Sequence, residues 1–161
     1  ELYRAPEKLI YRFINRQLVF AYDDRQRLTL NSCNVVIPHI PGLDMRYIMA
    51  ILNSRVAQYI YEKRYNAVKV LRSHIENIPV PVADEETQRR IISKAEELMA
   101  EELITESSVN SEMQTYKTGK DHLQRYRLYE EIDDIVRKLY SVTDEEYEFI
   151  KQSLSGDKYM L

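Results

Sequence analysis

Short apolar runs separated by polar turns make up the first part of the chain. Residues 9–14 and 18–22 are rich in β-favouring side chains, residues 27–31 alternate polar and apolar side chains, and residues 33–37 form a last run that ends at prolines. The pattern predicts a small antiparallel sheet of three or four strands over residues 8–38. One face of such a sheet needs a further layer to cover it.

The next segment is predicted to supply this layer. Apolar residues from Met45 to Ile60 recur at spacings of three and four, and Asp44 is a suitable N-cap residue. We expect one amphipathic helix that runs to about Arg64 and packs its apolar stripe on the sheet. The opposite face of this helix carries Arg46, Arg55 and Lys63.

An extended segment closes this first unit. Residues 65–72 indicate a short strand or loop, and residues 73–77 indicate a turn of helix. Two prolines within residues 78–82 force an extended chain. We therefore predict a domain boundary after residue 82, which divides the chain into residues 1–82 and residues 83–161.

The second half shows helical periodicity. Residues 84–104 begin with three acidic side chains, which are favourable at a helix N-terminus, and continue with an apolar stripe. Residues 105–119 are rich in Ser, Thr and Asn and predict a break, after which a second helix spans about residues 120–141. Thr143 and Glu146 form a capping box that starts a third helix. The first two helices predict an antiparallel hairpin.

These elements together predict an α+β fold. It consists of a small antiparallel sheet packed on a long amphipathic helix, followed by a helical, hairpin-like C-terminal region. The composition agrees with a soluble globular protein, since 44% of the 161 residues are hydrophobic and 30% are charged. This excludes a collagen, a disordered tail and a membrane protein, because the apolar runs are far shorter than the ~20 residues that span a bilayer.

Cysteine content and the chain start add two expectations. Cys33 is the only cysteine, which excludes an internal disulfide framework and a multi-cysteine zinc site. The sequence starts with Glu1 and shows no secretory signal, so we expect a cytoplasmic protein and a fragment of a longer chain.

Charge divides the chain into two unlike halves. Residues 1–82 carry 12 Lys and Arg against 7 Asp and Glu, a net charge of +5, whereas residues 83–161 carry 11 against 19, a net charge of −8. The asymmetry favours a polyanion-binding first half and a solvated acidic second half.

Residues that would carry catalysis are scattered. His39, His74 and His122 lie far apart without partners at metal-ligand spacing, and Cys33 falls in an apolar run, which predicts a buried, inert thiol. The acidic residues within 130–134 are interpreted as a solvated helix face. A glycine-rich nucleotide loop and a nucleophile elbow are both missing from the sequence. We therefore expect no catalytic residue, no metal site and no cofactor in this chain by itself.

Recognition of DNA is the chemistry that remains. Arginine suits guanine edges, asparagine suits adenine edges, and lysine suits phosphates, so polar and basic residues interleaved in the first half are candidates for DNA contacts. Ordinary solvent-facing residues are the alternative interpretation of the same pattern. The DNA-binding candidates are Arg12, Arg16, Arg25, Arg27, Asn31, Asn34, Tyr65, Asn66, Lys69 and Arg72.

Several of these segments, in this order, resemble the TaqI-like C-terminal specificity domain of restriction–modification enzymes. The similarity lies in residues 5–14, 18–23 and 28–37, in the Leu-Asn-Ser step within residues 47–55, and in the closing segment 70–81. It covers about residues 5–82. It implies that residues 1–82 are a DNA target-recognition domain.

The helical half adds a second similarity. Residues 81–92 resemble the start of the spacer helices in type I specificity subunits, and residues 131–146 resemble the C-terminal ending of fused methyltransferase–specificity proteins. In those proteins this segment usually reads Leu-Tyr-Gly-Leu-Thr. In this chain Ser141 and Val142 replace the Gly and the second Leu. The resemblance implies a helical spacer or docking region over residues 83–161.

The resemblance also implies the partners. Double-stranded DNA would be read by the specificity domain, which positions an adenine methyltransferase that uses S-adenosylmethionine and flips its target base. The catalytic Asn-Pro-Pro-Tyr/Phe motif of such methyltransferases does not occur in this sequence. The methyltransferase domain or subunit, and any nuclease, would therefore lie elsewhere in the same system. One alternative is a docking or dimerisation module that self-associates through its helices. Another is a stand-alone enzyme with an unfamiliar site.

Overall fold

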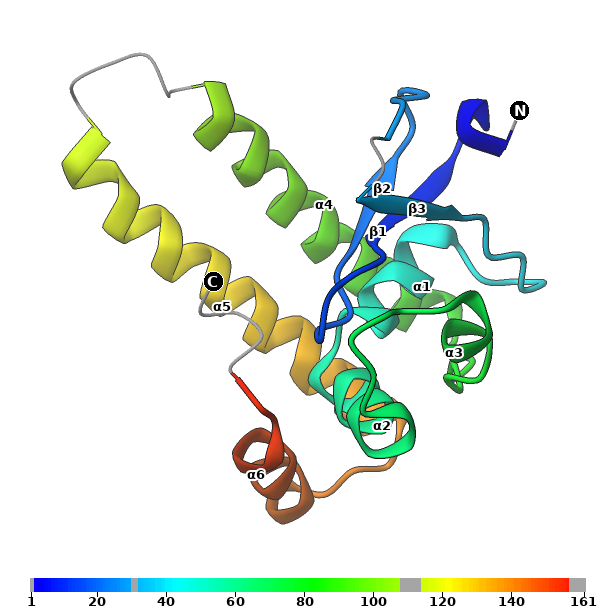
Figure 1. Ribbon diagram of the computed structural model, residues 1–161. Helices are drawn as coiled ribbons and strands as arrows, with labels where there is room; N and C mark the ends of the chain where they lie inside the picture. Colours follow the sequence, from blue (N-terminus) through cyan, green and yellow to red (C-terminus); the bar gives the residue numbers. More distant parts are fainter. Residues whose placement is uncertain (1, 30–31, 108–113, 157–161) are drawn as a thin grey trace.

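The computed structural model describes residues 2–29, 32–107 and 114–156, and its backbone is shown in Figure 1. The strands are β1 (Lys8–Arg12), β2 (Phe20–Asp23) and β3 (Cys33–Val36), preceded by the short 3-10 helix η1 (Leu2–Arg4). The helices are α1 (Met45–Leu52), α2 (Arg55–Tyr65), α3 (Arg72–Glu76), α4 (Glu85–Ser107), α5 (Gln114–Leu139) and α6 (Asp144–Ser153). The predicted α+β class is confirmed.

The sheet has the strand order β2-β1-β3, and both pairs are antiparallel. Leu9 and Tyr11 of β1 share one face with Phe20 of β2, and all three are buried in the core beneath α1. Because side chains alternate along a strand, Ile10 and Arg12 lie on the other face, which we call the outer face.

The strand expected at residues 27–31 does not form in the described part of that segment. Residues 24–29 are irregular, and residues 30–31 lie outside the described residues. The physical reason is the carboxylate of Asp23, which accepts the backbone N–H groups of Arg25 at 3.3 Å and Arg27 at 2.9 Å. These bonds curl the chain locally, so the backbone groups are not available for a sheet ladder.

The single long helix expected over residues 45–64 is two helices, α1 and α2. The Asn53 side chain lies against β2: its amide nitrogen donates to the carbonyl of Phe20, and its amide oxygen accepts from the N–H of Phe20, both at 2.8 Å. Ser54 then caps α2 by accepting from the N–H of Ala57 at 3.1 Å. The polar Asn-Ser pair therefore ends one helix and starts the next.

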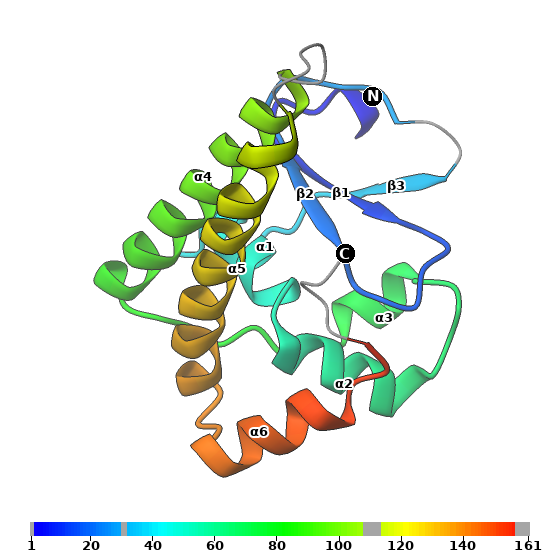
Figure 2. The ribbon, with the colours of Figure 1, turned by 90° about the vertical axis from the view of Figure 1, so that its left-hand side faces the viewer.

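Helices α4 and α5 form the predicted antiparallel hairpin, which stands to one side of the sheet in Figure 2. Both extend into the segment where a break was predicted, because an existing helix adds polar residues at little cost, and the six residues 108–113 between them are not described. The capping box of α6 is confirmed by hydrogen bonds between Thr143 and Glu146 in both directions. None of the helices in the described ranges is long and apolar enough to cross a membrane.

The hydrophobic core continues across the predicted domain boundary. Ile91 of α4 and Val136 of α5 belong to the same buried cluster as the residues of α1 and the sheet. The extended segment between the halves is held from both sides, since the hydroxyl of Tyr47 donates to the carbonyl of Pro81 at 2.7 Å and that of Tyr140 donates to the carbonyl of Pro79 at 2.5 Å. The boundary after residue 82 stays a prediction, but the two sides share one core.

Candidate nucleic-acid interface

The candidate residues fall into two groups at different ends of the sheet. One group surrounds the end of β1, and we call residues 12–15, 32–34 and 66–72 the distal corner. The other group, Arg25 and Arg27, lies in residues 24–29 at the opposite end of β2, and we call this segment the crossover loop. Asn31 lies outside the described residues.

Backbone hydrogen bonds assemble the distal corner from three separate segments. Phe13 donates its N–H to the carbonyl of Ser32 at 3.2 Å and accepts the N–H of Val70 at 2.8 Å. Ile14 and Lys69 form an antiparallel bridge. The segment between α2 and α3 therefore continues the edge of the sheet after β3, and Figure 2 shows this side of the molecule facing away from α4 and α5.

Three cations at this end of the sheet have no carboxylate partner. Arg12 and Lys69 in the distal corner, and Arg16 in the connection that follows it, are exposed and make no ion pair with any described residue. The ammonium of Lys69 lies 5.9 Å from the centre of the Phe13 ring. Arg72 differs, because its guanidinium bonds the carboxylate of Glu76 at 2.6 Å. Exposed cations without partners are the groups most available to a polyanion.

Three further candidates, Tyr65, Asn66 and Asn34, lie in or directly beside the distal corner. The ring of Tyr65 stacks on His74 with a centroid distance of 4.1 Å. Asn66 ends α2 in the left-handed conformation, with φ 38°, and is exposed. Asn34 lies opposite Tyr11 and is half-buried on the helix-facing side of the sheet, not on the outer face with Arg12. The structure thus brings these residues to one corner but points them in different directions.

A buried amide that sequence reasoning missed holds the connection between β1 and β2. The Gln58 side chain accepts the N–H of Leu18 at 2.7 Å and donates to the carbonyl of Arg16 at 3.0 Å. Gln58 is 1% exposed. Its position four residues after Ser54 and three before Tyr61, on the buried stripe of α2, is the sequence signal that could have identified it.

A buried ion pair positions the crossover loop. Lys8 and Asp23 face each other at the ends of β1 and β2, with 2.7 Å between the ammonium and the carboxylate, and both side chains are buried. Burial alone would raise the pKa of Asp23, but the bonds from Lys8 and from the backbone of Arg25 and Arg27 outweigh it and lower this pKa below its ordinary value. The loop that carries the two exposed arginines is therefore tied to the core.

A cavity of about 580 Å³ lies between the sheet and the helical hairpin. Met49 of α1, Leu98 of α4 and Ile132 of α5 contribute apolar lining, and Arg25 and Arg27 of the crossover loop line it too. The cavity is separate from the distal corner.

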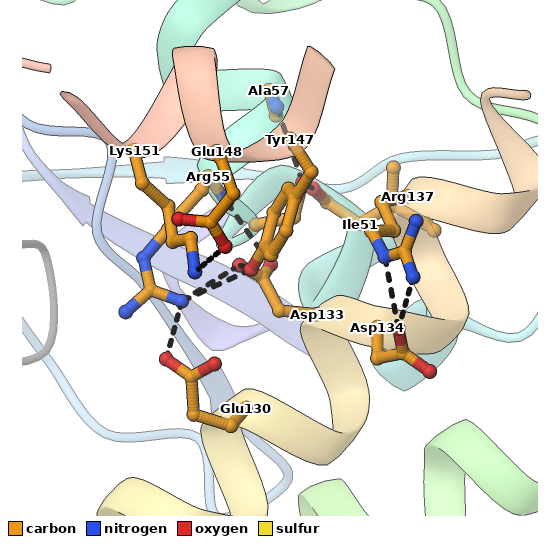
Figure 3. Close-up of polar contacts among 11 residues, drawn as sticks. Ile51, Arg55, Ala57, Glu130, Asp133, Asp134, Arg137, Tyr147, Glu148 and Lys151 are labelled. Carbon is orange, nitrogen blue, oxygen red and sulfur yellow. Dashed lines mark hydrogen bonds and ion pairs between the residues drawn. The ribbon is translucent and has the colours of Figure 1, made fainter. Parts of the chain in front are cut away.

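Two expectations about charged side chains are wrong. Arg55 was expected on an exposed helix face and Asp133 on a solvated one, yet both are buried (Figure 3). The Asp133 carboxylate accepts from the backbone N–H of Arg55 at 3.1 Å, from its guanidinium at 3.2 Å and from the hydroxyl of Tyr147 at 2.6 Å, and Glu130 pairs with the same guanidinium at 2.7 Å. Single-helix periodicity could not show this, because the partners come from α2, α5 and α6.

Cys33 is half-buried on the outer face, and not fully buried as expected; its partner across the sheet, Arg12, is exposed. Among the described residues, His, Cys, Asp and Glu side chains form no group of three or more that could hold a metal ion.

The fold and this surface define a class: a small α+β domain that displays unpaired cations on one side of its sheet. Residues 1–80 match the family model of the TaqI-like C-terminal specificity domain. These residues therefore belong to the TaqI-like C-terminal specificity domains of restriction–modification enzymes, a family whose role is DNA recognition and which is generally non-catalytic. A search of curated proteins finds no match to the chain.

Proposed function

We propose that this chain is the DNA target-recognition unit of a restriction–modification enzyme, and that the distal corner is the surface that contacts duplex DNA. The observation that carries the proposal is the set of exposed, unpaired cations Arg12, Arg16 and Lys69 on the side that faces away from the acidic hairpin. The family of residues 1–80 supports the same role.

The geometry suggests how the contacts are divided. Arg12 lies on the outer face of β1, and Lys69 pairs with Ile14 two positions further along the chain. There both cations would contact phosphates on the DNA backbone and set the orientation of the domain. The backbone amides and side chains around them are held by the sheet ladder and by Gln58, so little conformational entropy is lost when DNA binds. Arg25 and Arg27 would reach DNA only where it extends past the other end of β2.

The proposal includes a larger protein or complex. An adenine methyltransferase domain or subunit that uses S-adenosylmethionine, and in some systems a nuclease, would act on the DNA that this chain selects. The resemblance of residues 131–146 to the ending of fused methyltransferase–specificity proteins supports this arrangement. In it, this chain contributes DNA binding and orientation, and the reacting base is flipped into the methyltransferase.

DNA binding by the 161-residue chain as a function of salt tests the proposal. We expect binding to a mixed-sequence duplex to weaken as salt rises, and the Arg12→Ala and Lys69→Ala changes each to reduce the slope of log K against log salt by about 0.9. Arg90→Ala is the matched control, because Arg90 is an exposed cation of α4 outside the distal corner. Equal slopes for wild type and the two corner variants would overturn the assignment.

A second role is supported for the helical half. We propose that α4 and α5 act as a spacer or docking arm for the methyltransferase, because the buried contacts of Asp133 with Arg55 hold the hairpin in one orientation to the specificity domain. Sedimentation velocity at increasing protein concentration tests this against self-association. We expect a monomer throughout, and a concentration-dependent dimer that persists in high salt would instead identify the hairpin as a dimerisation module.

A further inference from the structure

The distal corner exposes apolar side chains between its cations. Ile14 is 63% exposed and Val68 is 51% exposed. The antiparallel bridge puts Ile14 beside Lys69, and the N–H of Asn15 donates to the carbonyl of Val68 at 3.0 Å. Because adjacent side chains alternate, Ile14 and Lys69 share one side of the bridge and Val68 lies on the other. Arg12 precedes Ile14 by two positions on the outer face.

This placement has no explanation in the core of the protein. Val70, which alternates with Lys69, is buried, and Phe13 is half-buried. The Val70 side of the bridge therefore supplies the packing, whereas Ile14 on the other side remains in water beside the cations. Burying such side chains against a partner would be favourable by about 25 cal/mol per Å² of apolar surface.

We propose that Ile14 is a specificity-determining residue that contacts the C5-methyl group of a thymine in the major groove. Charge identifies the partner as DNA, because Arg12 and Lys69 lie beside Ile14 and would hold phosphates next to the apolar contact. The thymine methyl is the one apolar group that a base edge presents in the major groove, so an apolar side chain fixed between phosphate contacts selects it. The inference rests on the proposed function and deepens it.

The test compares thymine with uracil, because deoxyuridine lacks only the C5-methyl group. A pool of duplexes with a randomised core is enriched on the 161-residue chain, and each thymidine of the recovered site is then replaced by deoxyuridine in turn. We expect one or two replacements to weaken binding about fourfold each, which is the fold-change for loss of one buried methyl group.

Three variants locate the effect. In Ile14→Asn, which replaces the apolar side chain by a polar one without a methyl group, we expect the same deoxyuridine replacement to have no further effect, while the salt slope remains that of the wild type. Val68→Asn and Val82→Asn are the matched controls, because Val68 lies on the opposite side of the bridge and Val82 is 79% exposed and lies outside the distal corner. Both should keep the full thymine preference.

The outcomes separate this inference from the proposed function. Two results overturn the thymine contact and leave DNA recognition standing: salt-dependent, selective binding that is equally strong with deoxyuridine, or a deoxyuridine replacement that costs wild type and Ile14→Asn the same affinity. Failure of the chain to bind or enrich any duplex overturns both.

Discussion

Asp23 illustrates how one side chain links the core to a surface loop. Its carboxylate is buried, pairs with Lys8 and accepts two backbone N–H groups from the crossover loop. Lys8 also donates to the carbonyl of Tyr3 at 2.8 Å, so the ammonium is held from a second direction. Such a pair is costly to break, because removing one partner leaves the other buried without a counter-charge.

We expect Asp23→Asn to lower the free energy of unfolding by about 3 kcal/mol at neutral pH, measured by urea denaturation. Because the pKa of Asp23 is lowered in the folded state, its contribution is complete above the ordinary pKa of about 3.9 and is lost as pH falls towards the folded-state value. The difference between wild type and variant should therefore shrink at acid pH.

Asp24→Asn is the matched control for this experiment. Asp24 is the next residue, its side chain is 62% exposed, and its ion pair with Arg25 is loose at 4.0 Å. It should change stability by less than about 0.5 kcal/mol. If the difference between wild type and Asp23→Asn were independent of pH, the carboxylate would not be the charged group on which the loop depends.

At the level of elements, three helices meet at one buried carboxylate. Asp133 of α5 bonds α2 through Arg55 and α6 through Tyr147, as Figure 3 shows. The hydroxyl of Tyr147 donates to Asp133 and also accepts from the guanidinium of Arg55 at 3.1 Å. Burial raises the pKa of Tyr147 far above its usual range, and the Asp133 charge adds to this, so the hydroxyl stays protonated and keeps donating.

Tyr147→Phe should lower the free energy of unfolding by about 1–3 kcal/mol, because two buried partners each lose a hydrogen bond while the ring packing is kept. Tyr59→Phe is the control, since Tyr59 is half-buried on α2 and its hydroxyl has no hydrogen bond to a described residue. Denaturation at constant pH measures both. A Tyr147→Phe protein as stable as the Tyr59→Phe protein would show that the hydroxyl does not help to hold α6.

For the whole molecule, the decisive feature is the core shared by the specificity domain and the hairpin. Ile91, Ile132 and Val136 are buried together with the side chains of α1. Each such side chain contributes about 1.5–3 kcal/mol when it is fully buried, and a domain of ordinary stability has only about 5–15 kcal/mol in total. The stability of the sheet and of its helices therefore depends on α4 and α5.

A fragment that ends at residue 82 should accordingly fail to unfold cooperatively. We expect a broad thermal transition by circular dichroism and poorly dispersed amide signals by NMR, because the face of α1 beneath the hairpin would be exposed to water. A chain that ends at residue 156 serves as the control and should unfold in one sharp step. A sharp transition for the shorter fragment would establish residues 1–82 as an independent domain.

Local patterns were sufficient for most elements and for the family. The alternation in residues 8–12 and the capping box at Thr143 depend on neighbours a few residues apart, and both gave the observed element. Local patterns were misleading at Asn53 and at residues 27–29, where a side chain competes for backbone hydrogen bonds. Such competition depends on β2 being nearby, which spacing along the chain does not show.

Periodicity, composition and ordered motifs were enough to predict the α+β class, the helical hairpin, the specificity-domain family and the basic character of the first half, because these are properties of the chain. Three features emerge only from the folded arrangement: which cations are unpaired, the joint burial of Arg55 and Asp133, and the exposure of Ile14 beside Lys69. Burial and pairing depend on distances between segments far apart in sequence, and those distances are set when the chain packs around one core.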